Sequence, residues 1–151
     1  MALLCRATVL QTQTHLCTNA IVPLRNFSVS SPLQQIIKLS RLQVVDNSAI
    51  GRAAAISGRP AKCIHVYNKK GVGTLGDKIL VAIKGQKKKA YIVGVKQKQK
   101  PFVPRFDSNN IVLVEESGMP TGTRIRVPIP SMLRGKEGDF TKILSIATKF
   151  I

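Results

Sequence analysis

The stretch that decides the fold spans residues 78–95 and reads KILVAIKGQKKKAYIVGV. It contains two apolar runs rich in valine and isoleucine, Lys78 to Ile83 and Ala90 to Val95. Apolar runs of this length, separated by glycine and polar residues, are typical of β-strands that are buried on at least one face. We therefore predict two strands here, joined by a short basic connection.

Further short strands are predicted on both sides of this stretch. Leu39 to Val45 alternates apolar and polar residues, and Asp46-Asn47-Ser48 ends it because these side chains bond local backbone and favour turns. The other predicted strands are Lys62 to Tyr67, Ile111 to Val114 and the alternating segment Thr123 to Val127. Many short strands with turn residues between them indicate an all-β domain, built as a small barrel or sandwich.

Two regions depart from the strand pattern. Residues 49–61 (AIGRAAAISGRPA) contain two glycines and a proline and are predicted to form a loop. Ser131 to Gly135 is predicted to be a single helical turn that glycine ends. A short C-terminal helix, capped by Asp139 or Thr141, is predicted from helical spacing of the apolar residues Ile143, Leu144, Ile146, Ala147 and Phe150.

The chain is strongly basic, with 24 Lys and Arg against 7 Asp and Glu and a formal charge of +17. Residues 1–45 hold four bases and no acid, so residues 46–151 hold 20 bases against 7 acids, a net +13. Self-repulsion at this charge would destabilise a lone compact domain, and a polyanion relieves it. The charge therefore indicates nucleic-acid binding, and the alternative is a merely soluble basic protein.

Membrane insertion and catalysis have little support in the sequence. No stretch approaches 18 uncharged apolar residues. The three cysteines (Cys5, Cys17 and Cys63) lack Cys-x-x-Cys spacing, and we expect Cys63 to be a buried, inert thiol. His65 alternates with Cys63 and Tyr67 on one face of a predicted strand, and a histidine without a second ligand or nucleophile is more often structural. We expect no enzyme activity, cofactor or metal site.

The string Gly71-x-Gly73-x-x-Gly76 matches the dinucleotide-binding fingerprint by composition alone. That fingerprint must open a helix after a strand, whereas these glycines lead into the strand predicted from Lys78. We interpret them as hairpin and barrel-corner residues. Lys69 and Lys70 precede them and, together with N–H groups of the turn, are candidates to hold phosphate.

Residues 84–100 (KGQKKKAYIVGVKQKQK) give the strongest signal, with seven lysines and no acid. Three of the lysines directly precede the predicted strand, and the last three alternate with glutamine after it. In an extended chain those last three would project to one side about 6–7 Å apart, a spacing comparable to that of phosphates. The alternative is a mobile, solvated loop that orders only on RNA. The candidate phosphate ligands are Lys84, Lys87, Lys88, Lys89, Lys96, Lys98 and Lys100.

Two further features bear on how RNA would be recognised. Arg124 and Arg126 share the face opposite Ile125, which suits phosphate or partner contact, although solubility alone could account for them. There is no tryptophan, and the aromatic side chains available to stack on bases are few. They are Tyr67, Tyr91, Phe102 and Phe106. Because single-strand binders use several aromatic platforms, we expect recognition of folded RNA by shape and backbone.

Residues 1–31 have the composition of a mitochondrial transit peptide, because they are rich in Ser and Thr, contain arginine and lack acids. Arg25-Asn26-Phe27-Ser28 resembles the arginine-anchored sites of mitochondrial processing peptidases, which predicts cleavage between about residues 27 and 35. The alternative is a disordered cytosolic tail. Residues 32–151 would then form a single RNA-binding domain in the mitochondrial matrix.

Five motifs in this order resemble the large-subunit ribosomal protein fourteen family, over about residues 39–151. They are Leu42-Gln43-Val44-Val45-Asp46-Asn47-Ser48, Cys63-Ile64-His65-Val66, Gly71-Val72-Gly73 with Gly76-Asp77, Arg105-Phe106-Asp107 and Gly122-Thr123-Arg124-Ile125. The leader and the compact basic connection at residues 84–89 resemble the mitochondrial branch of that family.

The resemblance implies a five-stranded barrel with C-terminal helices in a ribosomal protein that supports mitochondrial translation. It implies binding to large-subunit ribosomal RNA (rRNA) at the subunit interface, and we add Arg105 and Arg126 to the lysines as candidate RNA ligands. It also implies an intersubunit bridge to small-subunit rRNA and ribosomal proteins nineteen and three as neighbours. Finally, it implies docking of the ribosome silencing factor, which blocks subunit joining, and by position Thr123, Arg124 and Lys142 would face that interface.

Two other functions are weighed against this one. A free single-strand RNA-binding barrel of the cold-shock type would need base-stacking aromatics on one sheet face. A small enzyme would depend on His65 or Cys63, and substitution of either would then abolish a turnover while leaving RNA binding intact.

Overall fold

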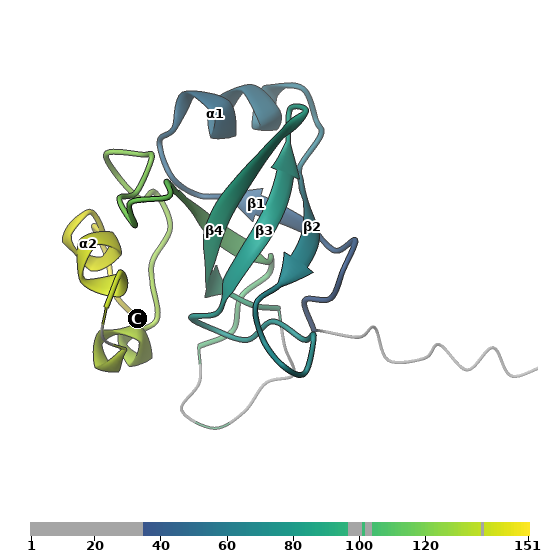
Figure 1. Cartoon of the computed structure of the whole chain (residues 1–151). Coiled ribbons are helices and arrows are strands. Elements are labelled where there is room, and N and C mark those ends of the chain that lie inside the picture. The colour runs from purple at the N-terminus through teal and green to yellow at the C-terminus, as the bar shows by residue number, and fades with distance from the viewer. Residues whose placement is uncertain (1–34, 97–100, 102–103, 137) are drawn as a thin grey trace, which may run out of the picture. The chain divides into compact units, whose positions relative to one another are not determined.

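The computed structural model describes residues 35–96, 101, 104–136 and 138–151, and its strands close into a barrel (Figure 1). Adjacent strands are antiparallel, and the first closes the ring beside the fifth in parallel. The strands are β1 (Arg41–Val44), β2 (Ala61–Val66), β3 (Lys78–Ile83), β4 (Gln86–Gly94) and β5 (Asn110–Val114). The predicted all-β, five-stranded barrel is confirmed, and the sandwich alternative is wrong. The predicted leader, residues 1–31, lies outside the described residues.

Alternate strand residues fill the barrel interior, because successive side chains of a strand point to opposite faces. Val81, Ile92 and Leu113 are fully buried members of this interior cluster. Helix α1 (Ala49–Ile56) packs against β1 and β3 and adds Ala54 to the cluster. Each large side chain buried in this way stabilises the fold by roughly 1.5–3 kcal/mol.

Helix α1 corrects the prediction that residues 49–61 form a loop. The Ser48 side chain caps the helix by accepting a hydrogen bond from the Gly51 N–H at 3.1 Å. A Cβ at residue 51 would lie 2.7 Å from Cγ1 of Val44, so glycine here permits close packing on β1. The glycine was therefore a sign of close approach, and the overlooked sign of a helix was Ser48 before an eight-residue segment that contains four alanines.

The outer side of β5 and of the second half of β4 is also apolar. In β5, Ile111 and Leu113 belong to the interior cluster, whereas Val112 and Val114 belong to a second cluster outside the barrel wall. Both faces of this strand are therefore buried, which explains why its sequence is continuously apolar from Ile111 to Val114.

The C-terminal segment covers this outer side, beside β4 and β5 (Figure 1). It contains the 3-10 helix η1 (Ser131–Gly135) and helix α2 (Phe140–Ser145), which confirms the predicted turn and the short helix. Leu133, Phe140 and Ile143 point from these helices into the outer cluster and are buried there. This segment, residues 123–136 and 138–151, thus forms a second layer over one part of the barrel wall, and we call it the C-terminal layer.

Three details of the C-terminal prediction are wrong. Helix α2 ends at Ser145, because Ala147 and Phe150 instead form bridges with Ile125 and Ile129. The predicted strand Thr123 to Val127 is reduced to single bridges at Ile125. Asp139 occupies the N-cap position of α2 without a side-chain capping bond, and its carboxylate accepts a hydrogen bond from Tyr91 instead.

Candidate nucleic-acid interface

A cationic surface remains uncovered on the outward faces of β1, β2, β3 and the first half of β4, and we call it the open wall. One row of residues crosses all four strands in register, because Arg41 pairs with Lys62, Lys62 with Ala82, and Ala82 with Lys87. All three cations are exposed. The outward residues of the open wall are Arg41, Gln43, Lys62, His65, Tyr67, Leu80, Ala82, Lys87 and Lys89.

The charge pattern of this row is unfavourable in the isolated protein. Adjacent strands lie about 4.8 Å apart, so Arg41 and Lys62 are immediate neighbours and Lys87 lies two strands beyond. Like charges directly opposite each other on a sheet destabilise the pairing. No acid stands among the outward residues of the open wall. A chain of phosphates laid across the strands would convert this repulsion into attraction.

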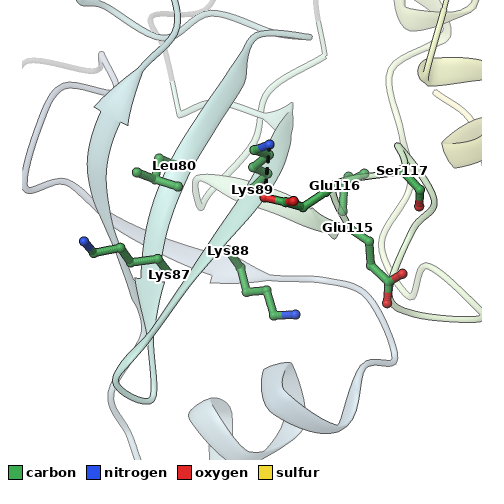
Figure 2. A pocket seen from close by; sticks show the side chains of 8 residues that line it. Leu80, Lys87, Lys88, Lys89, Glu115, Glu116 and Ser117 are labelled. Atoms are coloured by element: carbon green, nitrogen blue, oxygen red, sulfur yellow. Dashed lines mark ion pairs between the residues drawn. The ribbon is translucent and has the colours of Figure 1, made fainter.

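The hairpin that carries the three consecutive lysines is longer than predicted. Lys84 and Gly85 both have positive φ, 47° and 78°, and form a two-residue loop that pairs Ile83 with Gln86. Lys87, Lys88 and Lys89 therefore lie within β4 and do not precede it, which corrects the prediction. Because residues alternate along a strand, Lys87 and Lys89 face the open wall and Lys88 points to the other side. Figure 2 shows Lys87 and Lys88 pointing away from each other.

An open hollow of about 540 Å³ lies where these lysines meet the end of β5 (Figure 2). Lys89 Nζ lies 3.5 Å from Glu116 Oε1, and the Glu116 side chain is 92% exposed. Ion pairs this exposed contribute at most about 1 kcal/mol, so a phosphate can compete for the lysine. The hollow is lined by Leu80, Lys87, Lys88, Lys89, Val114, Glu115, Glu116 and Ser117.

The glycine-rich turn before β3 places Lys69 and Lys70 on the surface. Gly76 leads into a strand, as expected, so the dinucleotide fingerprint is excluded. The Asp77 carboxylate accepts hydrogen bonds from the Thr74 N–H at 2.8 Å and from the Thr74 hydroxyl at 2.9 Å. At least this N–H of the turn is therefore occupied by a protein carboxylate, and the lysines are the better phosphate ligands here.

Comparison with known proteins decides the family. The family model described as ribosomal protein L14p/L23e matches residues 35–151. The chain belongs to the ribosomal protein L14p/L23e family. A relative from Danio rerio, named Large ribosomal subunit protein uL14m, is 58% identical over 127 residues, which cover 84% of this chain and 89% of the relative. Membership confirms the resemblance that the sequence motifs carried, and it agrees with a non-catalytic protein.

The other predicted cations lie beside or beyond the open wall, and Lys96 lines a hollow together with Arg41, Gln43 and the acid Asp107. Lys96 and Arg105 are exposed near the loop before β5, and the Lys96 N–H donates to Asn109 Oδ1 at 2.9 Å. Arg126 is exposed, but its guanidinium donates to Asn47 Oδ1 at 2.8 Å, beside the turn after β1. Two further predicted ligands, Lys98 and Lys100, lie outside the described residues.

The residues that the L14p/L23e resemblance assigns to the subunit interface are exposed and lie on adjoining segments. Thr123 and Arg124 precede Ile125, whose N–H donates to the carbonyl oxygen of Ile146 just after α2 at 3.1 Å. Lys142 on α2 points its ammonium group at the carbonyl oxygen of Ser117, 3.5 Å away. The fold thus brings the two segments together, on the C-terminal layer.

A β-bulge between Cys63 and His65 corrects the prediction that these residues share a strand face. Cys63 is completely buried, which confirms its predicted burial, and burial raises the pKa of its thiol. His65 points outward, and its ring meets the ring of Tyr67 edge to face. The two residues named as candidates for catalysis therefore lie on opposite sides of the barrel wall.

Aromatic side chains in the described part of the chain do not form a broad stacking platform. Tyr91 is only 8% exposed and packs on Phe140, and Phe106 is buried as well. Phe102 lies outside the described residues. Tyr67, at 52% exposure, is the accessible member of the predicted set. A cold-shock type of binder, which needs several such rings on one face, therefore finds no support here.

The described residues offer neither a metal site nor a membrane-spanning helix. Within them, no three His, Cys, Asp or Glu side chains gather where a metal ion could be held. Helices long and apolar enough to cross a membrane are likewise missing from that part of the chain.

Sequence reasoning missed Arg41 and Lys62 as members of the cationic row. Both lie in predicted strands, and the alternation of apolar residues in β1 already turned Arg41 away from the core. The outward position of each cation could be predicted from its own strand. The register between strands, which aligns one cation from each of three strands, could not be predicted from the sequence.

Proposed function

We propose that this protein is a non-catalytic structural constituent of the mitochondrial large ribosomal subunit whose open wall holds rRNA by its phosphates. The observation that carries the proposal is the row of Arg41, Lys62 and Lys87, exposed and in register on strands without an outward acid. Lys89 and the turn lysines Lys69 and Lys70 extend the cationic surface. Each phosphate contact releases counterions and relieves repulsion within the protein.

The general assignment as a ribosomal protein is supported by the family to which the chain belongs. The protein is a ribosomal protein of the mitochondrial large subunit, in agreement with its family and with the relative named uL14m. The acid-free, arginine-containing composition of residues 1–31 supports import by a cleaved transit peptide. Residues 32–151 would then be the mature, single rRNA-binding domain.

The C-terminal layer is proposed to face the other subunit. Thr123, Arg124 and Lys142 would contact small-subunit rRNA in a bridge or, in free large subunits, the ribosome silencing factor. Ribosomal proteins nineteen and three would be neighbours. The exposure of all three side chains, on segments joined through Ile125 and Ile146, supports this assignment.

A salt titration tests the RNA part of the proposal. Binding of the full chain to fragments of large-subunit rRNA is measured between 50 and 200 mM salt. A protein that makes 6–10 phosphate contacts loses roughly 10³–10⁵ in affinity over this range, and we expect a decrease of that order. Affinity that hardly changes with salt would exclude the phosphate mechanism.

A sedimentation experiment tests the ribosomal assignment separately. Mitochondrial lysate is separated on a sucrose gradient, and the protein is detected in each fraction. We expect it in large subunits and whole ribosomes. Recovery only in lighter particles together with messenger RNA would favour a free RNA-binding protein instead.

A further inference from the structure

The open wall carries one feature that phosphate binding leaves unused, the aromatic pair His65 and Tyr67. Their ring centroids lie 5.2 Å apart at an interplanar angle of 84°, an edge-to-face arrangement that is favourable for aromatic rings. Both side chains are exposed, and Tyr67 keeps 52% of its surface accessible. Burial and hydrogen bonding, which account for the position of Tyr91, do not account for that of Tyr67.

The pair lies one row away from the cations along the strands. His65 pairs with Leu80, which is two residues along β3 from Ala82 in the Arg41–Lys62–Ala82–Lys87 row. Two residues of strand span about 6.6–6.8 Å, close to the distance between phosphates in an extended nucleic-acid strand. A nucleotide whose phosphate lies on Lys62 could therefore place its base against the rings.

We propose that His65 and Tyr67 form a stacking site for one unpaired RNA base, with flanking phosphates on Lys62 and Lys87. The proposal rests on the rRNA binding proposed above and adds a base contact to it. Every base has a flat face that can stack on an aromatic ring, whatever its sequence. In a regular duplex that face is hidden by neighbouring bases, so the site selects a bulged or looped-out nucleotide.

The surroundings favour a nucleotide over an apolar peptide. A peptide that covered Tyr67 and the half-buried Leu80 would also cover Lys62 and Lys87 without supplying them with anions. A nucleotide supplies both an aromatic face and a charge of the needed sign. Of these two ligands, the nucleotide therefore matches both the aromatic and the cationic part of the patch.

The test uses two hairpin RNAs that differ only at one bulged position, which carries adenine in the first and an abasic sugar in the second. We expect the full chain to bind the adenine RNA at least about fivefold more tightly than the abasic RNA. Tyr67→Ala should bind both RNAs equally, whereas Tyr67→Phe should keep the preference because it keeps the ring. Circular dichroism verifies that each variant is folded.

Lys62→Ala is the matched control on the neighbouring row. It should weaken binding of both RNAs by the same factor and lower the slope of log affinity against log salt by about one. If the wild type bound both RNAs equally and with a steep salt slope, the stacking site would be wrong and the phosphate mechanism would stand. Preference retained in Tyr67→Ala would also overturn the site, and failure to bind either RNA would overturn both proposals.

Discussion

Strand β4 passes through two surroundings that differ sharply on the outer side of the barrel. In its first half, Lys87 and Lys89 face the open wall, whereas in its second half Tyr91 and Val93 are buried beneath the C-terminal layer. The backbone ladder to β3 is continuous from Gln86 to Tyr91, so the difference lies in side chains alone. One half contributes stability and the other contributes charge, and each can therefore be altered without the other.

The largest effect is expected from the covered half. Ile143 on α2 is fully buried in the outer cluster, and Ile143→Ala should lower the free energy of unfolding by about 2–5 kcal/mol, as measured by urea denaturation. RNA affinity measured well below the melting temperature should stay as in the wild type.

Met132→Ala is the control for this change. Met132 lies on the neighbouring helix η1 and is 60% exposed, so its loss should alter stability by no more than about 0.5 kcal/mol. Equal stability of the two variants would show that α2 does not dock on the barrel.

On the open wall we expect RNA affinity to change while stability is kept. The variant to test is the triple substitution Arg41→Ala, Lys62→Ala and Lys87→Ala. Because the three charges repel one another, the free energy of unfolding should not decrease. The slope of log affinity for rRNA against log salt should become shallower by about three. Fluorescence anisotropy over a salt series measures this slope.

A second triple variant removes the same charge elsewhere, by Arg52→Ala, Arg59→Ala and Lys149→Ala. These three residues are exposed and lie off the open wall. If this variant reduced the salt slope as much as the first, the binding would depend on net charge and the row would have no special role.

The two halves of β4 also differ in how well the sequence predicted them. The apolar run from Ala90 was recognised because Val and Ile are typical of strands. The lysines before it were assigned to the connection, since their place in the ladder depends on the loop at Lys84 and Gly85 and on pairing with β3. Barrel closure depends on the parallel pairing of β1 with β5, residues far apart in the sequence. The strand pattern therefore left a barrel and a sandwich open, and the family resemblance favoured the barrel.

The side of the sheet to which each side chain points was harder to predict than the positions of the strands. The bulge in β2 placed Cys63 and His65 on opposite sides, although strict alternation assigned them one face. Helix α2 ended early because Ala147 bridges to Ile125, a tertiary contact that overrides local helical spacing. The strands and the basic segment were thus local properties of the sequence, whereas the cationic row and the aromatic pair depend on register.

The boundary between the two halves holds a hydrogen bond that makes stability depend on pH. The Tyr91 hydroxyl donates to Asp139 Oδ2 at 2.8 Å, and Lys78 Nζ lies 3.7 Å from the same oxygen. Burial, followed by the bond to Asp139, raises the pKa of Tyr91 to about 12. The bond from Tyr91, aided by the charges of Lys78 and Lys142, holds the pKa of Asp139 below its usual range.

The direction of each effect follows from these shifts. Because the pKa of Asp139 is lowered in the folded state, its contribution is present above about pH 4 and is lost as the pH falls through the folded value. Because the pKa of Tyr91 is raised, its contribution is present below about pH 10 and is lost as the pH rises through about 12. Melting temperatures from pH 2 to 11 should decline towards both ends.

Tyr91→Phe should flatten both declines, because it removes the hydroxyl and leaves the packing against Phe140 in place. Its effect on the free energy of unfolding at pH 7 should be smaller than that of Ile143→Ala. Superimposable melting profiles for the variant and the wild type would mean that this hydrogen bond does not link the layer to the barrel.

The smallest effect is expected where the open wall meets an acid. Glu116→Gln removes the partner of Lys89, and because the pair is exposed the stability should change by less than about 1 kcal/mol. Affinity for rRNA at low salt should rise by roughly two- to fivefold, since Lys89 is freed and a negative charge near the incoming phosphates is lost. Glu115→Gln makes the same change of net charge at the neighbouring position on the rim of the hollow. A larger gain in affinity for Glu116→Gln than for Glu115→Gln would place Lys89 among the phosphate ligands. Equal gains would mean that Lys89 attracts RNA only through long-range electrostatics.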